Sequence, residues 1–286
     1  MKPRDTKVIC LSDMHTGSTT ALFPHYKILN NGFWQFKHTR YVPSGLQCDL
    51  WTHFDKGAAA IASKQKKDRK RLIVVVDGDA TDGDHHGTLQ LATRNPLEQK
   101  DLHVFIMNWF LHKIGFAKNK GDLLFYVSGT ETHVGEIEDA IAEEMNAERP
   151  ALSSGVFDFL PLEVNNRLLW FLHHGRSPGT SYNKGDAIRN FLKRIYWEYS
   201  SQGKRIPDAV ISGHYHVPVK TSYDYDWNTM HGMILPAWQT KTRYGYRVAP
   251  SESNKIGMAE IDISADGIMH FPKPDIMELE DGIVKV

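Results

Sequence analysis

The chain has 286 residues, of which 41% are hydrophobic, so it can bury a sizeable core in one large domain or two small ones. Its 34 basic residues balance 34 acidic ones, so the overall charge does not indicate a polyanionic partner. It does not exclude a local basic face. Two cysteines are too few for a disulfide framework. The sequence also lacks an apolar signal core and an apolar run near the roughly 18 residues of a membrane span. These features favour a soluble cytoplasmic protein.

In chain order, strand-like and helix-like segments alternate through the first half. Strands are predicted at 7–11, 72–77 and 122–128, with helices near 54–70, at 97–116 and near 135–148. This alternation favours parallel βαβ units. In the second half, strands are predicted at 157–164, 168–173, 208–212, 217–223, 230–235, 257–263 and 267–271, with a helix at 184–201. No repeat or linker interrupts the pattern, which predicts one domain over residues 1–286.

A long stretch at 16–53 follows the first predicted strand, whereas a βα connection usually has about 2–6 residues. It is rich in aromatic and basic residues, including Trp34, Phe36, Lys37 and Arg40, and is too aromatic to be typical of a disordered segment. Two interpretations stay open. The insertion packs on the protein body, or it covers a site and Trp34 contacts substrate.

Histidine and aspartate recur beside glycine where apolar runs end. The five blocks are Asp13-Met14-His15, Gly78-Asp79-Ala80-Thr81-Asp82, Gly129-Thr130-Glu131-Thr132-His133, His173-His174-Gly175 and Gly213-His214-Tyr215-His216. Open α/β sheets bind ligands at the carboxyl ends of their strands. Imidazoles and carboxylates gathered there form a mixed nitrogen and oxygen site suited to Mn, Fe or Zn. The pattern predicts a metal-dependent hydrolase.

The spacing within the blocks suggests how ligands would meet a metal. Asp13 and His15 are two residues apart, as are His214 and His216, and in extended backbone such residues point to the same side. Asp79 ends a very apolar run, where an unpaired carboxylate would be costly, so we expect it to bridge two cations.

Other polar residues of the second block have less specific roles. Asp82 is predicted either to support the ligands or to be a turn residue. His86, in the glycine-flanked loop that follows, is predicted to contact substrate or to be an exposed loop histidine.

The blocks D-x-H, G-D-x-x-D, a variant of G-N-H, H-G and G-H-x-H, in this order over residues 13–216, resemble the calcineurin-like metallophosphoesterase superfamily. The resemblance implies a four-layer α/β/β/α sandwich of two mixed sheets flanked by helices. It implies two divalent metal ions at the carboxyl ends of the strands and phosphoester hydrolysis by a metal-bound hydroxide. The short single-domain form also resembles phage and prophage members.

The resemblance further implies which residues hold the ions. Those of one ion would be Asp13, His15 and His216. Asp79 matches the bridging residue. The other ion would take His214 and a histidine of the fourth block, where His174 is favoured over His173 because the family's ligand directly precedes glycine.

The third block departs from the family pattern. Thr130 stands where the family has an asparagine ligand, and Glu131 stands where it has the histidine that protonates the leaving oxygen. A threonine hydroxyl is a weaker ligand than an amide oxygen. Either Glu131 or His133 enters the site, or the second ion is held less tightly. His133, two residues further on, is predicted to be the general acid.

Two cationic features have two interpretations each. Arg176, near His174, is either a phosphate clamp or a loop cation. The charge run at 64–71 is either a solvated helix end, which the helix dipole favours, or a contact for a phosphate backbone.

The predicted function is a dinuclear metal-dependent phosphoesterase, with Mn as the favoured metal and a phosphodiester substrate, including nucleic acid or a nucleotide. The preference for diesters and for nuclease activity rests on the aromatic and basic insertion, which is suited to stacking bases. The alternatives are a phosphomonoesterase or small-nucleotide phosphohydrolase, and a non-catalytic scaffold that retains the fold. No membrane is expected, and no protein partner is indicated.

Overall fold

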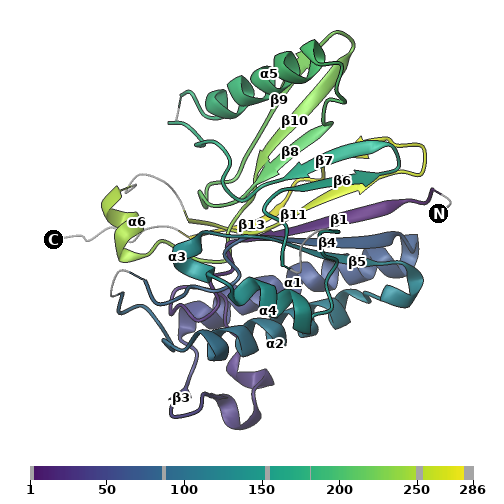
Figure 1. The fold of residues 1–286 in the computed structure, drawn as a ribbon. Helices are drawn as coiled ribbons and strands as arrows, with labels where there is room; N and C mark the ends of the chain where they lie inside the picture. The colour runs from purple at the N-terminus through teal and green to yellow at the C-terminus, as the bar shows by residue number, and fades with distance from the viewer. Residues whose placement is uncertain (1–2, 86–87, 152–154, 181, 249–253, 280–286) are drawn as a thin grey trace.

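Two mixed β-sheets lie face to face between two layers of helices in the computed structural model (Figure 1). The structure describes residues 3–85, 88–151, 155–180, 182–248 and 254–279. The order of layers is the α/β/β/α arrangement that the sequence predicts. Among the described residues, no helix is both long and apolar enough to cross a bilayer.

The first sheet contains the parallel strands of the N-terminal half. Its order is β12 (Met269–His270), β11 (Asn254–Ile263), β1 (Thr6–Ser12), β4 (Arg71–Asp77) and β5 (Leu123–Val127), and β13 (Asp275–Leu279) also pairs with β11. β1, β4 and β5 are parallel, while β11 runs antiparallel to β1. The carboxyl ends of β1, β4 and β5 therefore meet at one edge.

The second sheet holds the strands of the C-terminal half. Its order is β6 (Leu160–Val164), β7 (Arg167–Phe171), β8 (Ala209–Ser212), β10 (Asn228–Ile234) and β9 (Val219–Tyr225). β7, β8 and β10 are parallel, and β6 and β9 are antiparallel edge strands.

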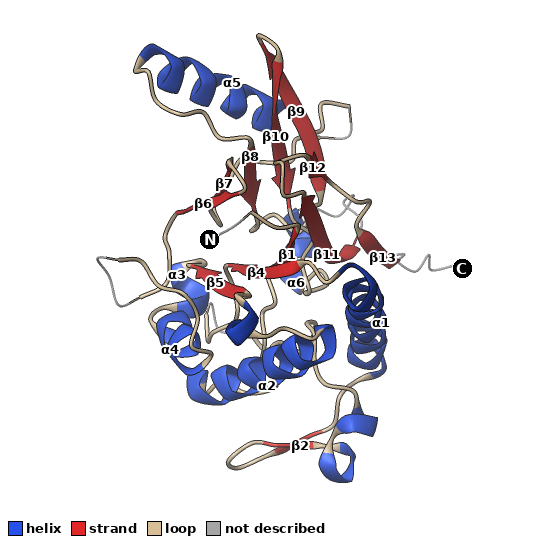
Figure 2. Cartoon of the chain, turned by 90° about the vertical axis from the view of Figure 1, so that its right-hand side faces the viewer, coloured by secondary structure: helices blue, strands red, loops and turns tan. Residues whose placement is uncertain are grey.

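The helices cover the outer faces of both sheets (Figure 2). The first sheet is covered by α1 (Gly45–Asp68), α2 (Pro96–Ile114) and α4 (Ile137–Glu144), and the second by α5 (Asp186–Ser201). The remaining short elements are η1 (Tyr26–Ile28), η2 (Asn30–Gly32), β2 (Trp34–Gln35), β3 (Arg40–Tyr41), η3 (Lys118–Lys120), α3 (Glu131–Val134) and α6 (Arg243–Val248).

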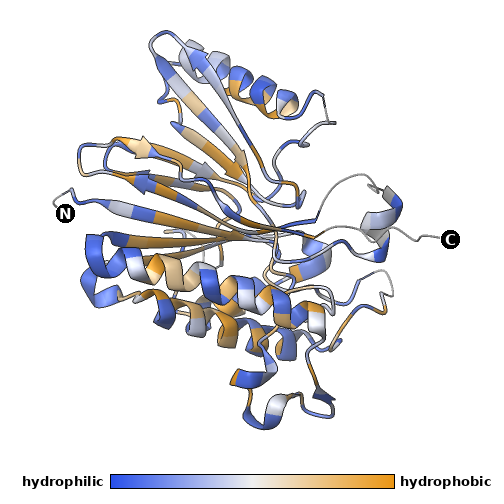
Figure 3. Cartoon of the chain, turned by 180° about the vertical axis from the view of Figure 1, so that it is seen from behind, coloured by the Kyte–Doolittle hydropathy of each residue, from blue (hydrophilic) through white to orange (hydrophobic). Residues whose placement is uncertain are grey.

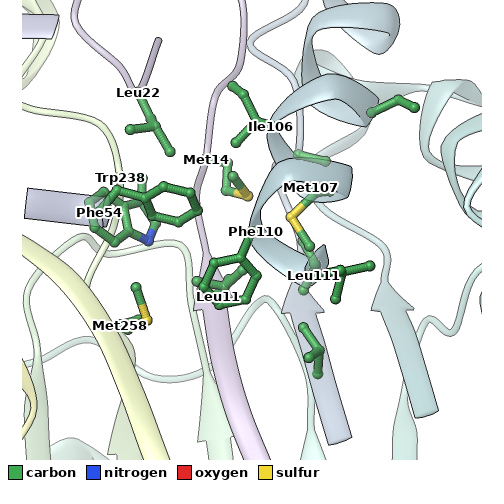
Figure 4. Close-up of a cluster of buried hydrophobic side chains, with 14 of the residues drawn as sticks. Leu11, Met14, Leu22, Phe54, Ile106, Met107, Phe110, Leu111, Trp238 and Met258 are labelled. Atoms are coloured by element: carbon green, nitrogen blue, oxygen red, sulfur yellow. The ribbon is translucent and has the colours of Figure 1, made fainter. Parts of the chain in front are cut away.

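The alternation of side chains along β1 divides the core. Ile9 and Leu11 face the helices, while Val8 and Cys10 face the second sheet. β4 alternates in the same way and is buried on both faces, which explains its uninterrupted apolar run. Figure 4 shows the helix-side cluster, in which Leu11 lies near Phe110. A third cluster fills the space between the second sheet and α5.

The predicted insertion at 16–53 is partly helix. α1 begins at Gly45 rather than near residue 54, because Ser44 and Gln47 form a capping box at its N-terminus. Trp34 packs with its ring centroid 5.0 Å from that of Phe105 on α2. Figures 1 and 2 both place the short strands β2 and β3 on the far side of α2 from the sheets. The described contacts of Trp34 thus support the packing interpretation.

Two other elements differ in their boundaries from the sequence prediction, and two further elements were not predicted. The helix expected near 135–148 is two helices, α3 and α4, separated at Gly135, which has a positive φ of 47°. The strand expected from residue 157 begins at Leu160. Neither α6 nor β13 was predicted, because both are short and lack a clear apolar period.

Candidate metal centre

The five sequence blocks meet at one place, where strands of both sheets end. The first three blocks follow β1, β4 and β5 of the first sheet, and the last two follow β7 and β8 of the second. Trp238 donates its backbone N–H to the carbonyl of Asp13 at 3.0 Å, which fixes the loop after β1. The site therefore lies across the junction of the two sheets.

The backbone of the candidate ligands is left-handed, not extended. Positive φ angles occur at Asp13 (50°), His15 (41°), Asp79 (48°), His214 (72°) and His216 (54°). The expectation that each pair points to one side because it lies on an extended strand was wrong. β1 ends at Ser12 and β8 at Ser212, so tight turns direct these side chains. Such conformations cost about 1–3 kcal/mol each and cluster at functional sites.

Glycines beside the ligands allow the turns to approach one another. A Cβ at Gly129 would collide with the backbone nitrogen and a carboxylate oxygen of Asp79. A Cβ at Gly213 would collide with the side chain of Ser12. Gly129 and Gly213 are thus packing requirements of the site.

Asp13 is fully buried and holds the first group together. Its carboxylate accepts from the Ser12 hydroxyl at 2.5 Å and from the backbone N–H of His214 at 3.0 Å. Its Oδ1 lies 3.2 Å from Nε2 of His216. Burial alone would raise the pKa of Asp13, but the neighbouring His216 and His173 lower it below its usual range.

His15 is oriented by a carboxylate behind it. Its Nδ1 lies 2.9 Å from Oδ1 of Asp82, and its Nε2 lies 3.2 Å from Nε2 of His216. Asp82 also accepts from the side-chain amide of Gln239 at 3.1 Å. A carboxylate that fixes a histidine tautomer is the usual support of a metal-ligating histidine. Asp82 therefore has the geometry of a supporting group.

Asp79 lies between the two sets of histidines. Its Oδ2 lies 3.1 Å from Nε2 of His173 and 3.7 Å from Nε2 of His15. Its Oδ1 accepts from the backbone N–H of Thr130 at 2.6 Å. This central place is the one that a bridging carboxylate requires.

The structure distinguishes the two histidines of the fourth block. His173 is buried, and its Nδ1 lies 2.8 Å from the carbonyl oxygen of Asp77, which directs Nε2 into the site. His174 is exposed, with its ring centroid 4.5 Å from that of His214. The geometry favours His173 over His174 as the more rigid ligand. The sequence had favoured His174, because His174 directly precedes Gly175.

Four groups of side chains have ligand atoms that all lie within 4.8 Å of one another. They are Asp13, His15 and His216; Asp13, Asp79 and His173; His173, His174 and His214; and His15, Asp82 and His133. The groups share Asp13, His15 and His173, so they form one continuous cluster rather than separate sites.

The third block lies beside this cluster in an altered form. The Thr130 hydroxyl lies 3.3 Å from Oδ2 of Asp79 and 3.4 Å from Nδ1 of His214. Glu131 is exposed as the first residue of α3. His133 is half-buried, with its Nδ1 2.9 Å from the carbonyl oxygen of Asp82 and its ring centroid 4.8 Å from that of His15. Of the two substitutes considered, His133 is the one that faces the cluster.

The electrostatics of the cluster suit a cation. Burial would lower the pKa of His173, but the carboxylates of Asp79 and Asp13 raise it to about 10. Burial lowers the pKa of His214 to about 4, with a further contribution from His173. The buried Nε2 of His173 lies 3.1 Å from Oδ2 of Asp79 but makes no well-directed hydrogen bond with any described residue. A metal ion would supply the positive charge and the partner that this nitrogen lacks, so the residues present fit the group.

Sequence reasoning missed the support beneath the ligands. Glu138 on α4 is fully buried and accepts from the backbone N–H groups of Ala80 at 2.9 Å and Gly129 at 2.7 Å. It joins the loops after β4 and β5. Burial raises the pKa of Glu138 to about 7. No spacing rule connects a helical glutamate to these loops, so only the tertiary structure reveals it.

Two remaining predicted residues lie apart from the ligand groups, and one cannot be placed. Arg176 is exposed, and its guanidinium stacks on Phe191 of α5 at 5.1 Å. Trp34 packs on α2, as described above. His86 lies outside the described residues.

No family model and no curated protein match the sequence. Among solved structures, similarity is found to a predicted phosphoesterase of Streptococcus pneumoniae (TM-score 0.32, 9% identity, covering 96% of this chain and 98% of the other). It is also found to the NAD nucleotidase of Haemophilus influenzae (TM-score 0.42, 11% identity, 97% and 51%) and to a 5'-nucleotidase precursor of Thermus thermophilus (TM-score 0.40, 10% identity, 96% and 54%).

The chain spans about half the length of these two nucleotidases.

Proposed function

We propose that this protein is a metal-dependent phosphoric ester hydrolase with two divalent cations. The observation that carries the proposal is the continuous cluster in which Asp13, Asp79 and His173 connect two sets of histidines. One cation would be held by Asp13, His15 and His216. The other would be held by His173, His214 and His174, with Asp79 between the two.

Two adjacent divalent cations, when bound, neutralise phosphate charge, lower the pKa of water and stabilise an in-line displacement. The side chains of the chain prepare this site. Asp82 fixes the tautomer of His15, and the carbonyl of Asp77 fixes that of His173. Both histidines then present Nε2 toward Asp79.

His133 is proposed to donate the proton to the leaving oxygen. Its Nδ1 faces the carbonyl oxygen of Asp82, so Nδ1 carries a proton and Nε2 is the atom left for exchange with a substrate. Burial and the neighbouring His15 lower its pKa, which makes the protonated form a stronger acid. Thr130 is proposed to contribute its hydroxyl in place of the family's asparagine.

The finer proposals concern substrate and metal. We infer a phosphodiester substrate, with a phosphomonoester as the alternative, and Mn as the metal, with Fe and Zn as alternatives suited to the same donors. The packed position of Trp34 removes one reason for a nucleic-acid substrate, so the basis for a nuclease is weaker than that for a phosphoesterase.

The test is metal analysis of the purified protein, followed by assays of nitrophenyl mono- and diesters, nucleotides and nucleic acids with added Mn²⁺, Fe²⁺ or Zn²⁺. Asp79→Asn should remove most activity and metal. Asp84→Asn, a change at an exposed aspartate of the same loop, is the matched control and should remove neither. Absence of hydrolysis by metal-loaded protein across the whole panel would reject the proposal and leave a scaffold.

A further inference from the structure

A hollow of about 620 Å³ lies at the opposite ends of the strands from the metal centre. It is bounded by the last turns of α1 and α2, by η3 and by residues that precede β1, β4 and β5. Figure 3 shows the helical layer as strongly hydrophilic at the end that lies toward the N-terminus. The volume of the hollow falls within the roughly 300–1,000 Å³ of small-molecule sites.

The side chains around this hollow are mostly cationic. The cations are Arg4, Lys66, Arg69, Lys70, Lys113 and Lys120, and the single carboxylate is Asp122. The whole chain has a formal net charge of zero, so this is a local accumulation of positive charge. The charge run noted at residues 64–71 supplies three of these cations.

Three of the cations have acidic partners. Arg4 lies 3.5 Å from Asp122, and Lys70 lies 2.8 Å from Asp262. Lys113 pairs with an aspartate of α1 at 2.7 Å. Over the described ranges, no carboxylate pairs with Lys66, Arg69 or Lys120, which are all exposed.

Helix dipoles account for part of this charge. α1 and α2 both end at the hollow, and each helix end carries roughly half a negative charge. Together they offset about one of the three unpaired cations. Positive charge is also crowded near Arg4. Its Nε is buried without a hydrogen-bond partner among the described residues, and burial together with Arg4 lowers the pKa of the neighbouring Arg71.

We propose that this hollow, the cationic pocket, binds a small polyanion that carries two or three linked phosphates. Its cations come from three separate parts of the chain, before β1, at the end of α1 and around η3, so they surround a ligand rather than line a flat track. A phosphate chain offers several oxygens to this spread of donors, and its charge matches the cations that the protein leaves unpaired.

The ligand of the cationic pocket is not the group that the metal centre would cleave. The seven residues of β4 separate the two sites by about 20 Å, at roughly 3.3 Å per residue. The proposal therefore goes beyond the proposed hydrolase function and does not depend on it. A phosphate chain could come from inorganic polyphosphate or from the tail of a nucleotide, and the experiment separates these sources.

The experiment is calorimetric titration of the full, metal-free chain with tripolyphosphate and, separately, with ATP. Lys66→Gln combined with Lys120→Gln changes two exposed side chains, so the fold is retained. The double variant should bind tripolyphosphate about tenfold or more weakly, since each removed charge contributes a modest ion pair. The matched control combines Lys56→Gln on α1 with Lys193→Gln on α5, both exposed and outside the pocket, and should bind as the wild type does.

The outcomes are distinct. Equal affinity for tripolyphosphate and ATP supports recognition of the phosphate chain alone, and tighter binding of ATP supports a nucleotide ligand. Equal weakening in the test and control variants would mean a non-specific charge effect and would overturn the proposal. The absence of tripolyphosphate binding in low salt would also overturn the proposal, even if long nucleic acid binds. Asp79→Asn should not change tripolyphosphate binding by the metal-free chain, which keeps this test separate from that of the hydrolase.

Discussion

At the scale of single residues, the sequence indicated which aspartates and histidines lie together, but it did not indicate their backbone conformation. The aspartates and histidines of the five blocks are rare after apolar runs, so their positions alone indicated a metal site. The left-handed φ of Asp13 and His216 leaves no signal in the sequence, because it is imposed by turns that tertiary packing holds. The same reason explains why the burial of His173 was missed: its partner is a backbone carbonyl of Asp77, on another strand.

The fourth block yields a direct test of the ligands. His173→Ala should lower bound metal and activity strongly, because it removes a buried and oriented imidazole, whereas His174→Ala should have a smaller effect. Losing an orienting group typically costs about 10- to 100-fold in metal affinity, and losing a ligand should cost at least that. Elemental analysis after dialysis against a metal buffer measures both variants. Greater loss from His174→Ala would restore the assignment based on the glycine neighbour.

The role of His133 as a general acid can be tested with leaving groups of different pKa. General acid help is typically worth about 10²–10⁴-fold, and only a leaving group of high pKa needs it. His133→Ala should therefore slow hydrolysis of an alkyl or nucleoside ester by that order and spare a nitrophenyl ester. Metal content should not change. A fall in metal content would instead identify His133 as a ligand that replaces the missing asparagine.

At the scale of elements, the longer strands and, apart from α1, the long helices were predicted within a few residues, because hydrophobic period fixes them. The start of α1 was missed because residues 45–53 belong to an aromatic stretch that was predicted to be an insertion. The capping box of Ser44 and Gln47, which begins the helix, is a weaker signal in the sequence. α6 and β13 were missed because only neighbouring elements stabilise such short segments.

The aromatic segment before α1 should affect stability rather than substrate binding. Phe36 is 3% exposed and belongs to the helix-side core, so Phe36→Ala should destabilise the protein by about 3 kcal/mol. KM for large and small substrates should stay the same. Tyr26→Ala, at an exposed aromatic of the same segment, is the control and should change stability by less than about 0.5 kcal/mol. A selective rise in KM for a large substrate would instead support a cap over the site.

A buried histidine connects elements around the site and predicts a pH effect. His103 of α2 contacts the carbonyl of Ala80 at 3.1 Å, the hydroxyl of Thr16 at 3.2 Å and that of Tyr126 at 3.2 Å. Burial lowers its pKa from the ordinary 6.5 to about 4. The folded state thus prefers the neutral ring. This contribution to stability is fully present above pH 6.5 and is lost as the pH falls toward 4.

Urea unfolding of the wild type and of His103→Gln at a series of pH values isolates this contribution. The wild type should lose up to about 3 kcal/mol more than the variant between pH 6.5 and 4, since one pKa unit corresponds to about 1.4 kcal/mol. The comparison cancels the opposite effect of His173, whose raised pKa favours the folded state at low pH. A constant difference between the two proteins at every pH would show that His103 does not titrate in this range.

At the scale of the whole molecule, the site depends on how the two sheets face each other. The first sheet contributes Asp13, His15 and Asp79, and the second contributes His173, His214 and His216. The sequence order predicts two groups of strands, but it does not specify that the carboxyl ends of β4 and β8 meet. That arrangement follows from packing between sheets, through residues such as Val75 and Ile211 that any apolar strand would supply.

Metal binding should therefore hold the two sheets together. Asp13, Asp79 and His173 come from three strand ends, and without a cation the two buried carboxylates depend on nearby histidines and backbone N–H groups for stabilisation. A ligand that binds only the folded state stabilises it by about 2.7 kcal/mol when its free concentration is about 100 times Kd.

We expect Mn²⁺ to raise the unfolding temperature of the wild type and metal removal to lower it. Hydrogen exchange should slow most at the ends of β7 and β8, next to the ligands. Asp79→Asn should show neither change at the same metal concentration. If the wild type binds metal with no gain in stability, or gains it equally in this variant, the cations do not bridge the sheets.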